Sequence, residues 1–281
     1  MKTVEFTKMV GAGNDFVVID ALNAGPAVSH LDNKIKEMAR AMCARETGIG
    51  ADGLLILDKS KKADYKMRII NADGSEAEMC GNGARCMAVY IARNKSPRKK
   101  LFKMETLAGI ILAQAREETA TVRLSDPKDY AAEISLHVNG QKIRVSYIDT
   151  GVPHVVVFVH GLKNIDVNSI GRIIRHHHRF QPRGANVNFV EQKDRGLVEV
   201  RTFERGVEGE TLACGTGSVA AGIVGFLKAN PDVENIIKAN LKVLTKSTGT
   251  LDVTFNLKNK KISDVWLTGP AKFIAKGEYY V

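Results

Sequence analysis

Several features are scarce in this sequence, and each scarcity argues against a class of protein. Only 6% of its 281 residues are aromatic, and a single residue is tryptophan. The sequence contains four cysteines. No stretch approaches the ~18 uninterrupted apolar residues of a membrane-spanning helix. The first ten residues, MKTVEFTKMV, lack the apolar core of a secretion signal. Four cysteines without such a signal do not indicate a disulfide framework. We therefore expect a cytoplasmic protein with no membrane partner.

Metal-ligand spacings are also missing. The cysteines are dispersed without a C-x-x-C pair, and no H-x-x-x-H pair occurs. The run His176-His177-His178 resembles a ligand cluster, but consecutive residues of a helix do not share one face. The sequence therefore predicts no metal site. A thiol–disulfide oxidoreductase stays open as an alternative, although no C-x-x-C motif supports it.

Positive charge is in excess, with 41 Lys and Arg residues against 31 Asp and Glu residues. The excess lies mostly in short runs, such as 95–100 (KSPRKK) and 258–261 (KNKK), which contain no aromatic residues. We interpret these runs as solvated loops of a basic enzyme and expect no nucleic-acid partner. A nucleic-acid-binding protein is the alternative that the charge leaves open, and its binding would fall steeply with salt.

The two halves of the sequence repeat one order of motifs. GIGADGLLIL, from Gly48, parallels RGANVNFVE, from Arg183, and each reads as a Gly-Ala turn before a buried strand. Thirty residues after Gly50 comes Cys80, and thirty residues after Gly184 comes Cys214; each cysteine begins a Cys-Gly-x-Gly motif. Several coincidences in the same order predict two similar α/β domains.

Helical patterns follow the same repeat. The segment after the first Cys-Gly-x-Gly has an apolar face of helical period, formed by Ala84, Met87, Ala88, Ile91 and Ala92. The segment 218–227 after the second is apolar nearly all round, which predicts a buried helix. An amphipathic helix is expected from the N-cap Ser29 to Met42. Its counterpart is expected over 168–176, with Ile170, Ile173 and Ile174 facing inward.

A cysteine at a glycine-rich helix start has specific chemistry. Backbone N–H groups and the positive end of the helix dipole favour a thiolate and lower the pKa of the thiol. The same N–H groups can hold a carboxylate. Two such thiols, on opposite sides of one carbon, could remove a proton from one face and return a proton to the other. A buried structural role is the alternative for any single cysteine, and we assign it to Cys43 and Cys86.

Five stretches resemble one known family: FTKMVGAGNDFVVID, GIGADGLLI, MRIINADGSEAEMCGNGARC, GANVNFVE and RTFERGVEGETLACGTGS. The chain resembles diaminopimelate epimerase, a family of amino-acid epimerases that work without pyridoxal phosphate. The resemblance runs in order along essentially the whole chain. It implies interconversion of LL- and meso-2,6-diaminopimelate, in lysine and peptidoglycan precursor biosynthesis, with no cofactor.

The resemblance also implies roles for individual residues. Cys80 and Cys214 match the acid/base pair, and His154 matches a polar position near the thiols. The remaining matches are substrate contacts: Asn14, Asn71, Gly81, Asn82, Asn186, Glu204, Arg205, Gly215 and Thr216. An arginine suits a distal carboxylate because it can bind that group bidentately. A local turn role is the alternative for Asn14 and Asn71, since asparagine is common beside glycine in loops.

The family fold implied is two similar α/β domains, each with strands wrapped around a central helix, and an active site in the cleft between them. We expect one domain over 1–124 and 267–281, carrying Cys80, and another over 125–266, carrying Cys214. A homodimer is possible. Many family members have Asn where this chain has Val152, so a racemase of another amino acid, such as histidine, is the alternative with the same two-cysteine chemistry.

Overall fold

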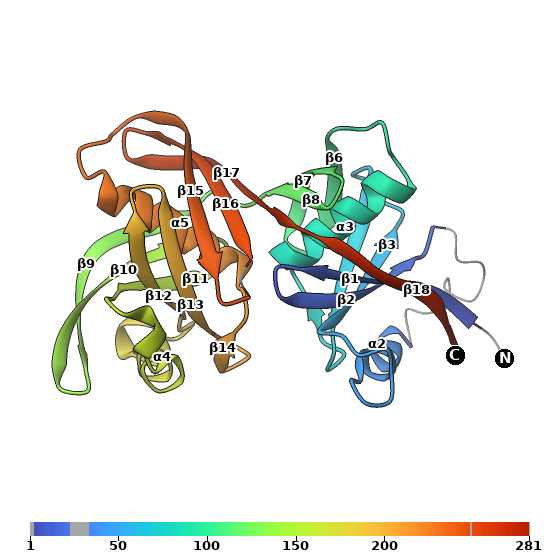
Figure 1. Ribbon diagram of the computed structural model, residues 1–281, viewed down its shortest axis with the longest axis horizontal. Coiled ribbons are helices and arrows are strands. Elements are labelled where there is room, and N and C mark those ends of the chain that lie inside the picture. The colour runs from blue at the N-terminus through green and yellow to red at the C-terminus, as the bar shows by residue number, and fades with distance from the viewer. Residues whose placement is uncertain (1–2, 23–33, 248, 281) are drawn as a thin grey trace. The chain divides into compact units, whose positions relative to one another are not determined.

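The computed structural model describes residues 3–22, 34–247 and 249–280 (Figure 1). Contacts between residues divide the chain into two units: Met1–Val122 with Gly269–Val281, and Arg123–Thr268. Both units combine a large sheet with a few helices, which confirms the predicted α/β class with two similar domains. Among the described residues, no helix has the length and apolar character needed to cross a membrane.

The first unit is a mixed sheet whose last strand comes from the end of the chain. Strand β18 (Lys272–Tyr280) pairs antiparallel with β1 (Thr3–Gly11), and β1 pairs with β2 (Asn14–Asp20). Strand β2 lies parallel to β3 (Gly53–Asp58), which pairs antiparallel with β4 (Tyr65–Asn71). The sheet continues through β6 (Phe102–Thr106), β7 (Gly109–Arg116) and β8 (Thr119–Arg123), while the short β5 (Glu76–Ala77) pairs with β4.

The second unit repeats this pattern of pairing. Strand β9 (Lys128–Val138) pairs with β10 (Gln141–Asp149), which pairs with β11 (Pro153–Phe158). Strand β11 lies parallel to β12 (Asn186–Asp194), which is antiparallel to β13 (Leu197–Glu204). Beyond them follow β15 (Ile236–Thr245), β16 (Thr250–Lys258) and β17 (Lys261–Pro270), and the short β14 (Gly209–Thr211) pairs with β13.

The order of parallel and antiparallel pairs is identical in the two sheets. Strands β2 and β3 match β11 and β12, both parallel pairs that bring a Gly-Ala-turn strand beside the strand before it. The parallel pair of β4 and β6 likewise matches that of β13 and β15. The sequence repeat is therefore a repeat of topology.

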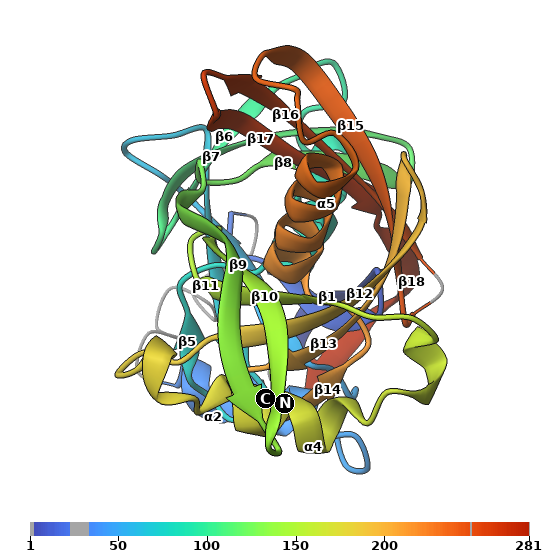
Figure 2. The same cartoon turned by 90° about the vertical axis from the view of Figure 1, so that its left-hand side faces the viewer.

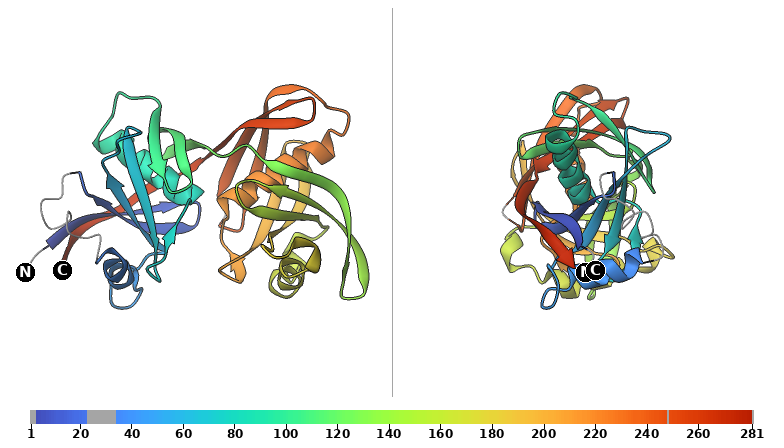
Figure 3. Two further views of the ribbon diagram at one scale, coloured as in Figure 1. Left: turned by 180° about the vertical axis from the view of Figure 1, so that it is seen from behind. Right: turned by 90° about the vertical axis from the view of Figure 1, so that its right-hand side faces the viewer.

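Each sheet curves around one buried helix. Helix α3 (Gly81–Asn94) contacts β1, β2, β3, β4 and β7, and the right-hand view of Figure 3 shows it surrounded by strands. Helix α5 (Gly215–Ala229) contacts β10, β11, β12, β13, β15 and β16 in the same way (Figure 2). Both helices begin at a Cys-Gly-x-Gly motif, as the sequence predicts. The residues of α5 are apolar nearly all round, as expected for a helix covered by strands, whereas α3 also buries the polar side chains of Asn82 and Arg85.

A second helix lies outside each sheet. Helix α2 (Ile35–Cys43) packs on β3 and β4, while its expected start at Ser29 lies outside the described residues. Helix α4 (Val167–Arg175) packs on β12 and β13 through Val167, Gly171 and Ile174. The expectation that Ile173 faces inward is wrong, since its side chain is exposed. The spacing of i, i+4 and i+7 in the buried set places Ile173 on the adjoining face.

Two short helices among the described residues, η2 (Leu162–Asn164) and η3 (His178–Phe180), flank α4.

Candidate active site

Cys80 caps the start of helix α3. Its backbone is extended, with φ of −140° and ψ of 117°, and its Sγ accepts a hydrogen bond from the backbone N–H of Gly83 at 3.5 Å. Its carbonyl accepts the first helical bond, from the N–H of Ala84 at 2.8 Å. The sulfur therefore takes the place that a serine or aspartate oxygen takes in an ordinary N-cap.

Cys214 makes the same arrangement at the start of α5. Its φ of −113° and ψ of 116° are again extended, its Sγ accepts from the N–H of Gly217 at 3.4 Å, and its carbonyl accepts from Ser218 at 2.8 Å. Both sulfurs thus lie at the N-terminal end of a buried helix, where the backbone N–H groups favour negative charge. The two thiols occupy equivalent positions in the repeated topology.

A glycine is required beside Cys214. A Cβ atom on Gly217 would lie 2.5 Å from Oδ1 of Asn188 and 3.3 Å from the Cys214 sulfur. The equivalent Cβ on Gly83 would be 3.1 Å from a methyl group of Leu55 and 3.6 Å from Cβ of Cys80. The second Cys-Gly-x-Gly motif is therefore packed more tightly against its sheet than the first.

The thiol of Cys214 differs from the sequence expectation in its electrostatics. Burial raises its pKa well above the ordinary value, and the negative charge of Glu204 raises it further. The hydrogen bonds with Thr216 and the N–H of Gly217 act in the opposite direction but do not outweigh these effects. The expected lowering by the helix start is thus overturned at Cys214, which is held as a neutral thiol.

Glu204 ends strand β13 next to this thiol. Its carboxylate accepts hydrogen bonds from the Thr211 hydroxyl and from the Cys214 thiol. Burial raises the pKa of Glu204, and these two bonds offset that rise only in part. A carboxyl and a thiol with raised pKa values lie together, so a proton can be shared between them.

His154 lies on β11, fully buried behind the same helix start. Its Nδ1 accepts from Nδ2 of Asn188 at 3.1 Å, and its Nε2 meets no hydrogen-bond partner in the described part of the chain. Burial, reinforced by the positive charge of Arg205, lowers the pKa of His154 to about 3. The ring is therefore neutral, with its proton on Nε2.

Asn188, on β12, is a residue that the sequence reasoning missed. It is fully buried, donates to His154 and to the carbonyl of Val155, and accepts from the hydroxyl of Thr202 at 3.0 Å. The spacing of Asn186 and Asn188 along one strand was the available signal, because residues two apart share a face of a sheet. Asn188 thereby links His154 to the glycine beside Cys214.

Asn186 and Arg205 belong to one local arrangement at the ends of β12 and β13. The Oδ1 atom of Asn186 accepts from the backbone N–H of Arg205 at 2.8 Å, and Nη1 of Arg205 donates to the carbonyl of Arg183 at 3.1 Å. Asn186 is buried, whereas Arg205 is only partly covered. The arginine is thus fixed at its backbone while its guanidinium keeps further donors for an anion.

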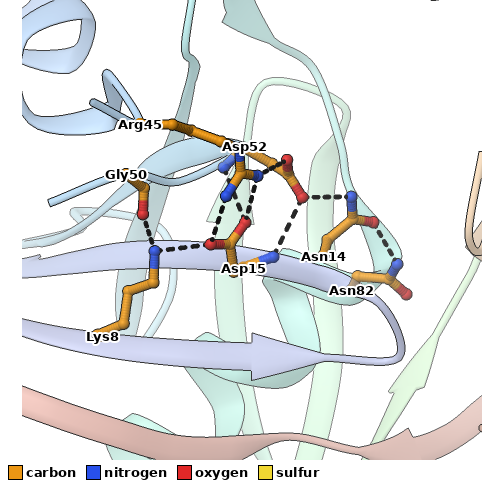
Figure 4. Close-up of polar contacts among 7 residues, drawn as sticks. All are labelled: Lys8, Asn14, Asp15, Arg45, Gly50, Asp52 and Asn82. Atoms are coloured by element: carbon orange, nitrogen blue, oxygen red, sulfur yellow. Dashed lines mark hydrogen bonds and ion pairs between the residues drawn. The ribbon is translucent and has the colours of Figure 1, made fainter. Parts of the chain in front are cut away.

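In the first unit, Asn14 and Asn82 are bonded to each other. Nδ2 of Asn82 donates to Oδ1 of Asn14 at 2.6 Å, and Nδ2 of Asn14 donates to Oδ2 of Asp52 at 2.8 Å (Figure 4). Asp52 in turn accepts from Arg45 at 2.7 Å and from the backbone N–H of Asp15 at 3.1 Å. The sequence reasoning missed Asp52, although it lies in the Gly-Ala-Asp step of the repeat.

Asp15 forms ion pairs with both cations of this cluster, Lys8 and Arg45. Burial by itself would raise its pKa, but bonds and charge interactions with Arg45 and Lys8 lower it to about 2. Lys8 also donates to the carbonyl of Gly50 (Figure 4). The two carboxylates beside Asn14 are therefore neutralised locally by two cations.

Asn71 is bonded within its own turn. Its backbone N–H donates to the carbonyl of Ser75 at 2.8 Å, and its Nδ2 donates to the Ser75 hydroxyl at 2.9 Å. This is the local turn role that was the alternative for Asn71. The side chain is exposed at the end of β4.

The other predicted positions lie in the first turn of a buried helix. Gly81 and Asn82 follow Cys80, and Gly215 and Thr216 follow Cys214. The hydroxyl of Thr216 lies 3.5 Å from the Cys214 sulfur, and its carbonyl accepts from Thr150. The start of a helix is a place where backbone N–H groups can bind a carboxylate.

Cys43 and Cys86 are buried thiols away from a helix start. Burial is the main cause that raises the pKa of Cys43 to about 11 and that of Cys86 to about 12. Neither can supply a thiolate near neutral pH, as their assignment to a structural role predicts.

A comparison with family models matches the chain to the model described as diaminopimelate epimerase, over residues 6–128 and 146–274. Among curated proteins, the diaminopimelate epimerase of Aquifex aeolicus is 40% identical over 284 residues, covering 98% of this chain and 97% of that protein. The diaminopimelate epimerase of Carboxydothermus hydrogenoformans is 41% identical over 295 residues, with 99% and 100% covered.

Solved structures share the fold at much lower sequence identity. A phenazine biosynthesis protein of the PhzF family from Bacillus anthracis has a TM-score of 0.73 with 18% identity, and the match covers 100% of each chain. A hydroxyproline epimerase from Agrobacterium vitis has a TM-score of 0.68 with 15% identity, over 99% of this chain and 91% of that chain.

Proposed function

Because this chain belongs to the diaminopimelate epimerase family, we propose that it interconverts LL- and meso-2,6-diaminopimelate by proton transfer at one α-carbon between Cys80 and Cys214. The observation that carries this proposal is the equivalent placement of the two sulfurs. Each caps a buried helix and accepts a hydrogen bond from the glycine N–H three residues later. A structural cysteine has no need of this placement in both halves of a repeat.

The reaction needs one base and one acid on opposite faces of the α-carbon. One cysteine, as thiolate, takes the α-proton and becomes a thiol, while the electron pair of the broken C–H bond is delocalised into the α-carboxylate. The other cysteine, as thiol, gives its proton to the opposite face and becomes a thiolate. The configuration at that carbon is then inverted, and the protonation states of the cysteines are exchanged.

The first turns of α3 and α5 supply the electrostatic part of catalysis. Negative charge builds on the substrate carboxylate as the α-proton leaves. Backbone N–H groups at Gly81, Asn82, Gly215 and Thr216 can donate to that carboxylate from helix ends with positive dipoles. Such preorganised donors stabilise the transition state more than the bound substrate.

The second unit supplies the proton donor in the resting site. Cys214 is held as a thiol by burial and by Glu204, so it is ready to protonate a carbanion. In the reverse direction Cys214 must act as thiolate, and its proton can then pass to the carboxylate of Glu204, which accepts the hydrogen bond of that thiol. The neutral His154 adds a polar group behind this helix start without adding charge.

Recognition of diaminopimelate needs groups for the distal amino-acid end. Arg205 can bind the distal carboxylate, because its guanidinium keeps free donors while Asn186 fixes its backbone. Glu204 and the asparagine side chains can bind ammonium and carboxylate groups. A site that holds a fixed L-centre leaves the other centre available for inversion.

Proton NMR of LL-diaminopimelate with the reduced protein in D₂O tests the reaction directly. We expect loss of the α-proton signal together with appearance of the meso isomer. If LL-diaminopimelate does not exchange while the thiols are free, the same assay with a panel of L-amino acids that includes histidine follows. If one of these amino acids exchanges its α-proton, it replaces diaminopimelate as the proposed substrate and the two-cysteine mechanism stands. If none of them exchanges, the proposal is refuted.

A further inference from the structure

Arg85 is a fully buried arginine that no carboxylate of the described residues accompanies. Its exposed fraction is 0%, yet its Nε has no hydrogen-bond partner among the residues that the structure describes. Nη2 donates to Oδ1 of Asn82 at 2.6 Å, and Nη1 donates to the carbonyl of Gly81 at 3.3 Å. Burial lowers its pKa to about 10, so the side chain stays a cation at neutral pH. Within the described parts of the chain, the hydrogen bonds of this buried cation go to amide oxygens alone, and burying such a charge costs free energy that packing does not explain.

The bond from Arg85 to Asn82 is the first of three consecutive side-chain hydrogen bonds, which we call the hydrogen-bond chain. Arg85 donates to Asn82, Asn82 donates to Asn14, and Asn14 donates to Asp52, at 2.6, 2.6 and 2.8 Å (Figure 4 shows the last two steps). These residues come from helix α3, from the start of β2 and from the turn before β3. Every bond in the chain runs in the same direction.

The two ends determine that direction. A guanidinium can only donate hydrogen bonds, and a carboxylate can only accept them. If the amide of Asn82 were flipped, its NH₂ group would face the NH₂ group of Arg85, and two donors would oppose each other. If the amide of Asn14 were flipped, its Oδ1 would face the carboxylate of Asp52, and two acceptors would oppose each other. The orientation of both amides therefore follows from the chemistry of the ends, independently of how amide atoms are assigned.

We infer that Arg85 is a positioning residue, which acts through Asn82 to hold the amide of Asn14 so that Asn14 presents N–H to a carboxylate of the substrate. Asn14 uses its carbonyl oxygen and one N–H inside the chain. The second N–H is the polar hydrogen it keeps for a ligand, and a carboxylate is the substrate group that accepts it. This inference rests on the proposed function only for the identity of the ligand.

A chain polarised from both ends makes a specific prediction about coupling. Removing Arg85 should make the side-chain amide of Asn14 more mobile, although the two residues are not bonded to each other. Replacing Asp52 by a weaker acceptor should do the same to the amide of Asn82. Neighbours along hydrogen-bonded networks couple in this way, whereas unconnected sites behave independently. A role of Arg85 in filling space alone would leave the amide of Asn14 unchanged.

The first measurement is hydrogen exchange of the asparagine side-chain amides by NMR, without substrate. Protein labelled with ¹⁵N-asparagine is compared with Arg85→Met and Asp52→Asn, and the signals are assigned with Asn14→Ala and Asn82→Ala. We expect exchange of the Asn14 amide to rise about tenfold in Arg85→Met, and that of Asn82 to rise comparably in Asp52→Asn. Unchanged exchange at the remote amide in both variants would overturn the inference. If Arg85→Met does not fold, the exchange of the Asn82 amide in Asp52→Asn decides alone, because Asp52 is partly exposed and its replacement leaves the core intact.

Asp64→Asn is the matched control. Asp64 is exposed to a similar degree, 32% against 35% for Asp52, and it too accepts from a cationic side chain and a backbone N–H. It lies outside the chain of bonds, so both amides should exchange as in the wild type.

The second test measures the steady-state kinetics of LL-diaminopimelate epimerisation. Arg85→Met should raise KM about tenfold with a smaller change in kcat, because Asn14 contributes to substrate binding. Arg85→Lys keeps a donor-only cation and should recover most of that loss. If the amides are coupled but the wild-type protein epimerises no substrate, the proposed function is wrong and the hydrogen-bond chain stands. An active wild type whose Arg85→Met variant has normal KM and normal exchange would discard the positioning role alone.

Discussion

The carboxylate of Glu204 accepts a hydrogen bond from the thiol of Cys214 and opposes the positive end of helix α5. A helix start by itself favours a thiolate. Here burial and a neighbouring negative charge reverse the balance, so the resting protein holds a proton at Cys214. The thiol state of this cysteine is thus set by strand β13 as much as by its own helix.

Glu204→Gln should lower the pKa of Cys214, because Glu204 raises it through both its charge and its hydrogen bond. Alkylation of Cys214 by iodoacetamide, followed across pH by peptide mass spectrometry, should then speed up at a lower pH than in the wild type. Glu210→Gln is the control, since Glu210 is a buried glutamate of the same unit that pairs with Arg201. Identical profiles for Glu204→Gln and the wild type would contradict the pairing.

Cys80→Ser and Cys214→Ser should each reduce turnover by at least about a hundredfold, because a serine hydroxyl is a far weaker general base and acid at neutral pH. Circular dichroism should show both variants folded. Cys43→Ala, at a buried thiol that ends α2, should keep turnover near that of the wild type. Two-base catalysis is wrong if either serine variant retains near wild-type epimerisation.

Arg205→Ala should raise KM about tenfold or more while kcat changes less, since the guanidinium is assigned to the distal carboxylate. Steady-state kinetics of LL-diaminopimelate measures both constants. Arg144→Ala, which removes an exposed arginine paired with Glu133 on the β9–β10 hairpin, serves as the control. A loss confined to kcat would move Arg205 to the reacting centre.

Stability should depend on pH through His154. Its pKa of about 3 in the folded protein lies below the ordinary 6.5, so the unfolded chain binds the proton more readily. The stability gained from the neutral ring is complete above pH 6.5 and is lost as pH falls from 6.5 toward 3. His154→Gln cannot be protonated and should flatten the fall of Tm over that window. The exposed His160→Gln should leave the wild-type slope, and an equal slope in His154→Gln would show that other groups control it.

Much of the fold could be predicted from the repeat of motifs in the sequence. An apolar face predicted helix α3, an apolar surface nearly all round predicted that α5 is buried, and the Cys-Gly-x-Gly motifs predicted that Cys80 and Cys214 begin them. The motifs do not give the strand order: that the segment 267–281 joins the first domain was expected from the family resemblance alone, and its pairing with β1 joins distant parts of the chain. Local patterns contain no information about such distant pairing.

The electrostatics of the site were the hardest to predict. The helix start at Cys214 is visible in the sequence, whereas the burial and the charge that override it come from β13. Asn188 and Arg85 were likewise missed because their importance lies in what they bond to, His154 in one case and Asn82 in the other. Residue type and spacing alone do not distinguish them from ordinary core and helix residues.

The unequal packing of the two glycine motifs leads to a final prediction. Alanine in place of glycine inside a helix normally stabilises by about 1 kcal/mol. At Gly83 the added methyl group would meet the end of the Leu55 side chain, which can move, so Gly83→Ala should be near neutral or stabilising. At Gly217 it would meet Oδ1 of Asn188, which bonds to Thr202 and cannot move freely because Asn188 is also bonded to His154.

Gly217→Ala should therefore destabilise the protein by about 1–3 kcal/mol, the range for overpacking a core. Urea unfolding of the two variants measures the difference. Displacement of Asn188 would also disturb His154 and the capping of Cys214, so kcat should fall in Gly217→Ala and change little in Gly83→Ala. Equal stability of the two variants would mean that the second helix start can relax, and that its tight fit does not hold the thiol in place.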